Sequence, residues 1–140
     1  MFDIIVQAAE NFFQHQIRLP FEVAEGGAEM RTLIASIDID AARERSHRVY
    51  VACDDAMVAM ITETFLGEPA EDEETMTDMV LETANLIVGS AKVLAEELGP
   101  VAFSIRTPNY VKYDRFDLEC DQLKTVSVDG RQMILGIKEQ

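Results

Sequence analysis

The chain has 140 residues, of which 48% are hydrophobic and 27% charged, and its formal net charge is −14 at pH 7. This length and apolar content suffice for one sizeable core, so we expect a single domain over residues 1–140. The excess of carboxylates excludes nucleic acid and anionic membrane surfaces as partners, because both would repel the chain. No apolar run approaches the roughly 20 residues that cross a bilayer. Since Asp3 also stands where a signal peptide would be basic, we expect a cytoplasmic protein.

Metal and disulfide chemistry have little support in the composition. Cys53 and Cys120 form no Cys-x-x-Cys pair, and only His15 and His47 accompany them. We therefore predict no metal site and expect both thiols to be reduced core residues.

The N-terminal third predicts a helix followed by a strand pair. Apolar residues recur at helical spacing before Pro20, which closes the helix and its exit loop: Phe2, Ile5, Ala9, Phe12 and Phe13. Residues 32–40 then alternate between apolar and polar, although Ile34 breaks the alternation. Residues 49–53 read as a second strand, and the two are expected to pair as a hairpin.

A second helix is predicted to begin at a cap formed by Asp54 or Asp55 and to end at Gly67. Five carboxylates then fall between Glu68 and Glu74. They suggest either a metal site or a solvated connection into the next helix, and the connection is the commoner case.

The third helix is predicted from Thr77 to Leu98, closed by Gly99 and Pro100. A rotation of about 100° per residue gathers one stripe that should face the core: Val80, Ala84, Ile87, Ala91, Leu94 and Leu98. The same rotation gathers a polar strip on the opposite side: Asp78, Glu82, Asn85 and Gly89, with Lys92 at its margin. Apolar residues flank that strip, with Met79, Leu86 and Val93 on one side and Leu81 and Val88 on the other. Such a frame is typical of a docking surface, and we predict that Met79, Leu86 and Val93 contact a partner.

Each polar residue of the strip also has an ordinary explanation. Thr75 and Asp78 resemble a capping box at a helix start. Glu82 could be an ordinary solvated acid, since most exposed glutamates on helices have no specific role. Asn85 is harder to explain in this way, because its side chain competes for backbone hydrogen bonds in a helix. Gly89, one turn further, costs up to about 1 kcal/mol relative to alanine. Two unfavourable choices on one face indicate a functional constraint, namely an outward carboxamide and an open approach to the backbone.

The C-terminal region predicts further strands. Val101, Phe103 and Ile105 alternate before a turn at Pro108, and Leu118 with Cys120 suggests another strand. Asp129-Gly130 then forms a two-residue hairpin signal between two alternating runs. The fold class expected is α+β, a largely antiparallel sheet covered on one side by long helices.

Asp78, Glu82, Asn85 and Pro108 are separated by three, two and twenty-two residues. This spacing resembles the signature of the CheC, CheX and FliY family of chemotaxis phosphatases, and a looser resemblance extends from Met1 to about Ile137. Within the family the chain is most similar to CheX, because it carries one copy of the Glu and Asn pair.

The resemblance implies a phosphatase that hydrolyses the aspartyl phosphate of a CheY-like response regulator in chemotaxis or two-component signalling. Asn85 would hold the attacking water, and Glu82 would pair with the lysine beside the phosphorylation site. Asp78, Gly89 and Pro108 would be auxiliary. The chain itself would bind no cofactor, since the Mg²⁺ belongs to the regulator, and a homodimer joined through sheet edges is expected.

Two other interpretations stay open from the residues. The same face could hold a phosphorylated regulator, or another chemosensory partner, without accelerating hydrolysis. The pattern could also arise by chance in an unrelated acidic domain.

Overall fold

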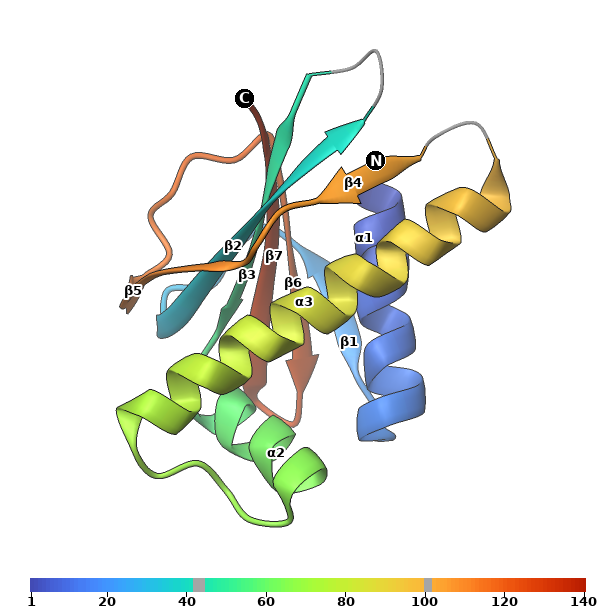
Figure 1. The fold of residues 1–140 in the computed structure, drawn as a ribbon. Coiled ribbons are helices and arrows are strands. Elements are labelled where there is room, and N and C mark those ends of the chain that lie inside the picture. The colour runs from blue at the N-terminus through green and yellow to red at the C-terminus, as the bar shows by residue number, and fades with distance from the viewer. Residues whose placement is uncertain (42–44, 100–101) are drawn as a thin grey trace.

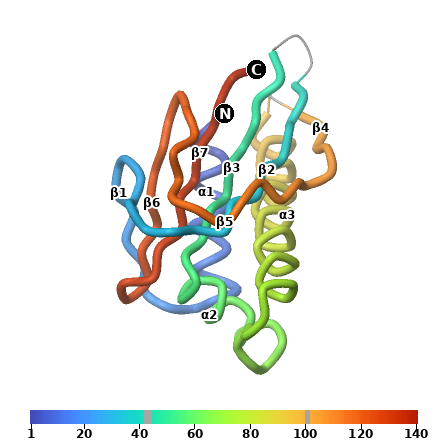
Figure 2. Tube along the Cα trace, turned by 90° about the vertical axis from the view of Figure 1, so that its left-hand side faces the viewer, coloured from blue at the N-terminus to red at the C-terminus, as the bar shows by residue number. Residues whose placement is uncertain are grey.

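The computed structural model describes residues 1–41, 45–99 and 102–140. The described residues form four helical segments: α1 (Phe2–Asn11), the π-helical η1 (Phe12–Ile17), α2 (Asp55–Leu66) and α3 (Glu73–Leu98). They also form seven strands: β1 (Glu22–Glu25), β2 (Arg31–Ala41), β3 (His47–Cys53), β4 (Phe103–Ile105), β5 (Asn109–Arg115), β6 (Gln122–Val128) and β7 (Arg131–Glu139). The helices pack against one face of the sheet (Figure 1, Figure 2). The expected α+β fold is confirmed.

The strands pair antiparallel in the order β1-β6-β7-β3-β2-β4, and β5 also pairs with β2. The expected hairpin between β2 and β3 is present, with Leu33 opposite Cys53. The β6–β7 hairpin turns at Asp129 and Gly130, whose φ angles of 50° and 82° are both positive. Positive φ at both central residues is the geometry that the Asp-Gly pair favours.

The main core lies between the sheet and the helices. Alternate residues of β2 and β3 point into it, among them Leu33, Ile37 and Val51. Ile34, the residue that breaks the alternation in the sequence, faces the opposite side of the sheet. Its apolar side chain therefore belongs to a second cluster, which is why the strand looks apolar on both faces.

The second cluster lies on the far face of the sheet, where the described residues place no helix. Ile34, Tyr50 and Ile134 are buried there beneath the segment that joins β5 to β6. Leu118 and Cys120 belong to that segment, so the strand expected around them is wrong. They are apolar because they cover the sheet, with Cys120 half-buried against Gly136.

The first helix changes its winding at Phe12. The α-helix α1 continues into the π-helix η1, and Arg18 ends it in the left-handed region with a φ of 62°. The backbone N–H of Arg18 donates to the carbonyl oxygen of Phe13 over 2.7 Å, a hydrogen bond that spans five residues. The sequence predicted a single helix here, and the π-helical turn has no simple sequence signature.

The α2 helix begins as predicted. Asp54 is its N-cap, and its Oδ1 accepts the backbone N–H of Met57 at 2.7 Å. Its other carboxylate oxygen accepts the N–H of Gln132 at 3.0 Å, which ties the helix start to β7. Gly67 ends the helix with a φ of 84°.

Two strands, β1 and β5, were not predicted from the sequence. Of the strand predicted after Pro100, the structure shows β4, whereas Pro100 and Val101 lie outside the described residues. No helix in the described parts of the chain is both long and apolar enough to span a membrane.

Candidate functional site

The polar strip lies on α3, and the start of that helix settles one alternative interpretation. Asp72 is the N-cap, and its Oδ2 accepts the backbone N–H of Thr75 at 3.0 Å. Hydrogen bonds from Thr75 lower the pKa of Asp72. The helix therefore begins at Glu73, four residues before the predicted start. Asp78 lies in the second turn, so the suggested capping role of Asp78 is wrong and its carboxylate points to solvent.

The three predicted polar side chains share one exposed face. Asp78, Glu82 and Asn85 are all solvent-exposed on α3, which places them one turn apart along the helix. Within the described ranges, none of these three side chains takes part in a hydrogen bond or an ion pair. An exposed carboxylate and carboxamide without internal partners remain free to bind another molecule. Their backbone, in contrast, is fixed by a helix of 26 residues.

Gly89 and Lys92 extend the same face toward the helix C-terminus. A β-carbon added at Gly89 would meet nothing within 4 Å, so no contact inside the protein requires a glycine there. Lys92 Nζ lies 3.7 Å from Glu96 Oε1 and is thus engaged along the helix. Gly89 consequently weakens the helix although no neighbour in the protein needs the space. This is consistent with close approach by another molecule.

The apolar frame around the strip is narrower than the sequence predicted. Leu86 and Val93 are 40% and 52% exposed, as a docking surface requires. Met79 is only 8% exposed and packs in the main core, so the expectation that it frames the strip at the surface is wrong. Val88 is also buried. The helix buries a wider sector than one stripe because it contacts both the sheet and α1.

The predicted core stripe of α3 is confirmed at Val80, Ala84, Ile87 and Ala91, which are all buried. Leu94 is half-buried against the core. The prediction is wrong for Leu98, which is 70% exposed at the last position of the helix.

Pro108 lies half-buried between β4 and β5, and both strands contact α3. A backbone hydrogen bond fixes the segment just before Pro108: the N–H of Arg106 donates to the carbonyl oxygen of Asp38 at 2.9 Å. Two residues beyond Pro108, Tyr110 packs against the core, and burial raises its pKa. The segment around Pro108 therefore lies against α3, the helix that carries the strip.

A groove runs alongside the strip, on the side of α3 that faces α1 and η1. Leu86 forms one wall with Ser90, and the facing wall and floor include Phe12, His15 and Phe65. The apolar spacing of the first helix gave no sign that Phe12, Phe65 and Leu86 would line one groove. This proximity comes from the packing of three helices, so no local pattern could have indicated it.

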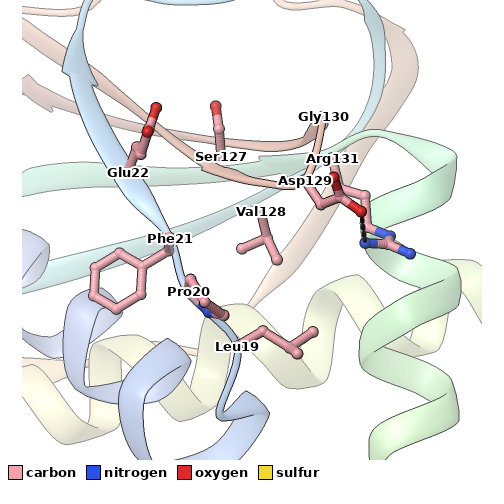
Figure 3. A pocket seen from close by; sticks show the side chains of 9 residues that line it. All are labelled: Leu19, Pro20, Phe21, Glu22, Ser127, Val128, Asp129, Gly130 and Arg131. Carbon is pink, nitrogen blue, oxygen red and sulfur yellow. Dashed lines mark ion pairs between the residues drawn. The ribbon is translucent and has the colours of Figure 1, made fainter.

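A separate hollow lies between the η1–β1 connection and the β6–β7 turn, as Figure 3 shows. Leu19 and Val128 line it, and Arg131 Nη1 lies 3.9 Å from Asp129 Oδ2 at its edge. It contains none of the predicted site residues. Among the residues described here, no three His, Cys, Asp or Glu side chains gather as a metal site would require.

Comparison with known proteins points to one family. The family model described as "Chemotaxis phosphatase CheX" matches residues 34–129, a range that includes Glu82, Asn85 and Pro108. No curated protein sequence matches the chain.

Several solved structures share the fold. The chemotaxis protein CheX from Vibrio vulnificus is 20% identical, with a TM-score of 0.78 and coverage of 99% of this chain and 97% of that one. The CheX of the CheX–CheY–BeF₃–Mg²⁺ complex from Borrelia burgdorferi is 14% identical, with a TM-score of 0.72 and coverage of 99% and 97%. FliY from Thermotoga maritima is 14% identical, with a TM-score of 0.59 and coverage of 97% and 84%.

Proposed function

The chain belongs to the CheX family of chemotaxis phosphatases, and from this premise we propose that it hydrolyses the aspartyl phosphate of a CheY-like response regulator. The observation that carries the proposal is the position of Glu82 and Asn85. Both are exposed on one face of α3, and neither side chain has a partner within the described structure. They are therefore free to enter the active site of another protein.

Asn85 positions the nucleophile. Its carbonyl oxygen accepts a hydrogen bond from a water molecule while its NH₂ group donates elsewhere. The water oxygen forms a bond to phosphorus as the bond from phosphorus to the aspartate oxygen breaks. The electron pair of the broken bond leaves on the aspartate carboxylate, and a water proton passes to the phosphate or the solvent. Phosphoryl transfer of this kind has a loose transition state, in which orientation and charge neutralisation contribute most of the acceleration.

Glu82 supplies the anchor. Its carboxylate pairs with the lysine beside the regulator's phosphorylation site, which holds the regulator against the middle of α3 and places Asn85 next to the phosphoryl group. Asp78 is auxiliary on the preceding turn, Gly89 keeps the next turn open, and Pro108 shapes the support of the helix.

The chain contributes no metal ligands of its own in this scheme. The Mg²⁺ that neutralises the phosphoryl oxygens belongs to the regulator substrate. The Borrelia burgdorferi structure is a complex of CheX with CheY, BeF₃ and Mg²⁺, so in that relative a regulator and the metal ion are present together. Beryllofluoride is a common stand-in for the phosphoryl group of an aspartyl phosphate.

A homodimer and a cytoplasmic location complete the proposal. Among the described strands, β1 ends the sheet on one side and β4 with β5 on the other, and each edge offers unpaired backbone groups to a second copy. The cytoplasm is where the phosphorylated regulator resides. Analytical ultracentrifugation at increasing protein concentration tests the dimer. A chain that stays monomeric at every concentration would contradict the proposed homodimer.

Phosphate release from phosphorylated CheY-like regulators in Mg²⁺ tests the activity. The wild-type protein should accelerate release, and Asn85→Ala should abolish the acceleration while binding is retained. Lys92→Gln on the same face serves as the control, because the proposal gives it no chemical role. Binding without acceleration by the wild type would favour a non-catalytic binding module instead.

A further inference from the structure

The polar strip is too small to be the whole docking surface. A specific protein interface buries about 800 Å² on each partner, usually with 20 to 30 residues. Asp78, Glu82 and Asn85 supply only a few polar contacts, so a bound regulator must also cover neighbouring surface. Leu86 directly follows Asn85 in the chain and lies at the edge of the groove between α3 and the first helix.

The composition of this groove resembles the centre of a protein interface. Phe12, Phe65 and Leu86 give it apolar walls, and Phe65 and Leu86 are 39% and 40% exposed. Asn11 and Ser90 add uncharged polar groups. An apolar centre with polar groups around it, depleted of charge, is typical of protein–protein contacts.

The groove also differs in charge from the rest of the molecule. The chain contains 26 Asp and Glu residues, yet no carboxylate is among the described residues that line the groove. Its one titratable group is His15. The groove can therefore accept the surface of an acidic protein without the repulsion that most of this molecule would exert.

The π-helical winding of η1 shapes one wall. Phe12, His15 and Gln16 all belong to η1 and all line the groove. Phe12 stacks on Phe65 of α2 with ring centroids 6.0 Å apart, which joins the two helices across the floor. π-Helical turns are rare and frequently occur at functional sites.

We propose that this groove, lined by Phe12, His15, Phe65, Leu86 and Ser90, receives an apolar side chain of the same CheY-like regulator whose aspartyl phosphate meets Asn85. The inference rests on the proposed function for the identity of the partner. The groove contact is the same before and during bond cleavage. It therefore sets affinity and the choice of regulator, while Glu82 and Asn85 set the rate of hydrolysis.

Two pairs of variants test the groove. Ser90→Trp fills it from an exposed position, and Ser90→Ala is its control at the same residue. Phe65→Ala removes part of the floor, and Leu66→Ala is its control, since Leu66 is exposed on the next position of α2 and does not line the groove. Circular dichroism and thermal melting verify that each variant is folded.

The measurements are the Kd for a CheY-like regulator loaded with BeF₃ and Mg²⁺, and kcat and KM for the phosphorylated regulator. Ser90→Trp and Phe65→Ala should each raise Kd and KM about tenfold and leave kcat near the wild-type value. The two controls should change Kd less than twofold.

The possible failures are distinguishable. An unchanged Kd and KM in both groove variants, with an active wild type that Asn85→Ala disables, would overturn the groove and leave the proposed function standing. A wild type that binds without hydrolysis would overturn the proposed function. The Kd values of the groove variants would still show whether the groove contacts the regulator. Absence of any binding by the wild type would overturn both.

Discussion

The Sγ atom of Cys120 lies directly over Gly136. A β-carbon at position 136 would stand 2.8 Å from that sulfur and 3.0 Å from a methyl carbon of Leu123. Gly136 is on β7, and Cys120 is on the segment that covers the far face of the sheet. This contact explains why a strand interior contains a glycine, since the covering segment approaches the backbone too closely for any side chain.

Gly136→Ala should therefore destabilise the protein by about 1 to 3 kcal/mol, because the added methyl group overpacks the second cluster. Urea unfolding monitored by circular dichroism measures the change. The double variant Gly136→Ala with Cys120→Ala should recover part of the loss, since it removes the sulfur that the methyl group meets. Equal losses with and without Cys120 would show that another contact is responsible.

Asp54 joins α2 to the sheet through two backbone hydrogen bonds, from Met57 and from Gln132. Asp54→Ala should lower the free energy of unfolding by about 2 to 3 kcal/mol, because it removes a cap and leaves two N–H groups without their acceptor. Asp72→Ala, at the exposed N-cap of α3, is the matched comparison and should cost less, because water can replace its bond. Similar losses of unfolding free energy in both variants would show that the burial of Asp54 does not make its hydrogen bonds more important than those of an exposed cap.

Gly89 weakens α3 without an internal reason. Gly89→Ala should raise the free energy of unfolding by up to about 1 kcal/mol. The same variant should slow dephosphorylation of a regulator, because the new methyl group projects from the face that docks. Thermal melting and phosphate release on the same preparation measure the two effects. A more stable variant with full activity would show that the regulator does not approach this turn closely.

Asp121 gives the stability an acid-dependent component. The backbone N–H of Glu139 and the Lys138 ammonium group, at 2.8 and 3.3 Å, lower the pKa of its carboxyl group below the usual 3.8. Above that ordinary value the carboxylate is charged in both states and its contribution is complete. As the pH falls below it, the unfolded chain binds the proton first, so stability is lost until the pH passes the folded pKa.

Asp121→Asn should therefore make the free energy of unfolding depend less steeply on pH below about pH 4. Near neutrality the pH dependence should be the same as in the wild type. Urea midpoints measured from about pH 6 down to about pH 2 test this linkage. Glu97→Gln is the control, since Glu97 is exposed and makes no ion pair among the described residues. A variant with the same acid slope as the wild type would refute the contribution of Asp121.

The burial of the second cluster also protects a thiol. Desolvation, aided by the nearby Asp121 carboxylate, raises the pKa of Cys120 to about 11. At pH 8 almost none of it is thiolate, which is the reactive form. Cys120 should react with Ellman's reagent at least tenfold more slowly than a free cysteine, and urea should remove the protection. Rapid modification of the folded protein would contradict the packing over Gly136.

Local chemistry determined the parts of the fold that the sequence predicted correctly. Asp54 marks the start of α2 and Gly67 marks its end, because a carboxylate cap and a left-handed glycine act within a few residues. Asp129 and Gly130 specify their hairpin in the same way. The exposed face of α3 was also predictable, since helical spacing alone brings Glu82 and Asn85 together.

The missed strand β5 shows where local pattern fails. Ile34 pairs with Lys112 and Ala35 pairs with Tyr110, so Val111 is an extra residue in a β-bulge. The bulge shifts the side-chain alternation, which lets Tyr110 and Tyr113 both pack on the main core despite their odd separation. A period of two residues cannot detect such a strand. The buried position of Met79 and the groove beside Leu86 likewise depend on how helices far apart in the sequence pack together.

Asn85 occupies the thirteenth of the 26 positions of α3, with Glu73 and Leu98 at its two ends. About 18 Å of helix extends on either side of it. Fraying begins at helix termini and reaches the centre last. The backbone amide of Asn85 should therefore exchange with deuterium among the slowest of the helix, although its side chain is exposed to solvent. A water molecule held by that carboxamide is thus positioned by the least mobile turn of α3, and the regulator has to move to the helix rather than the helix to the regulator.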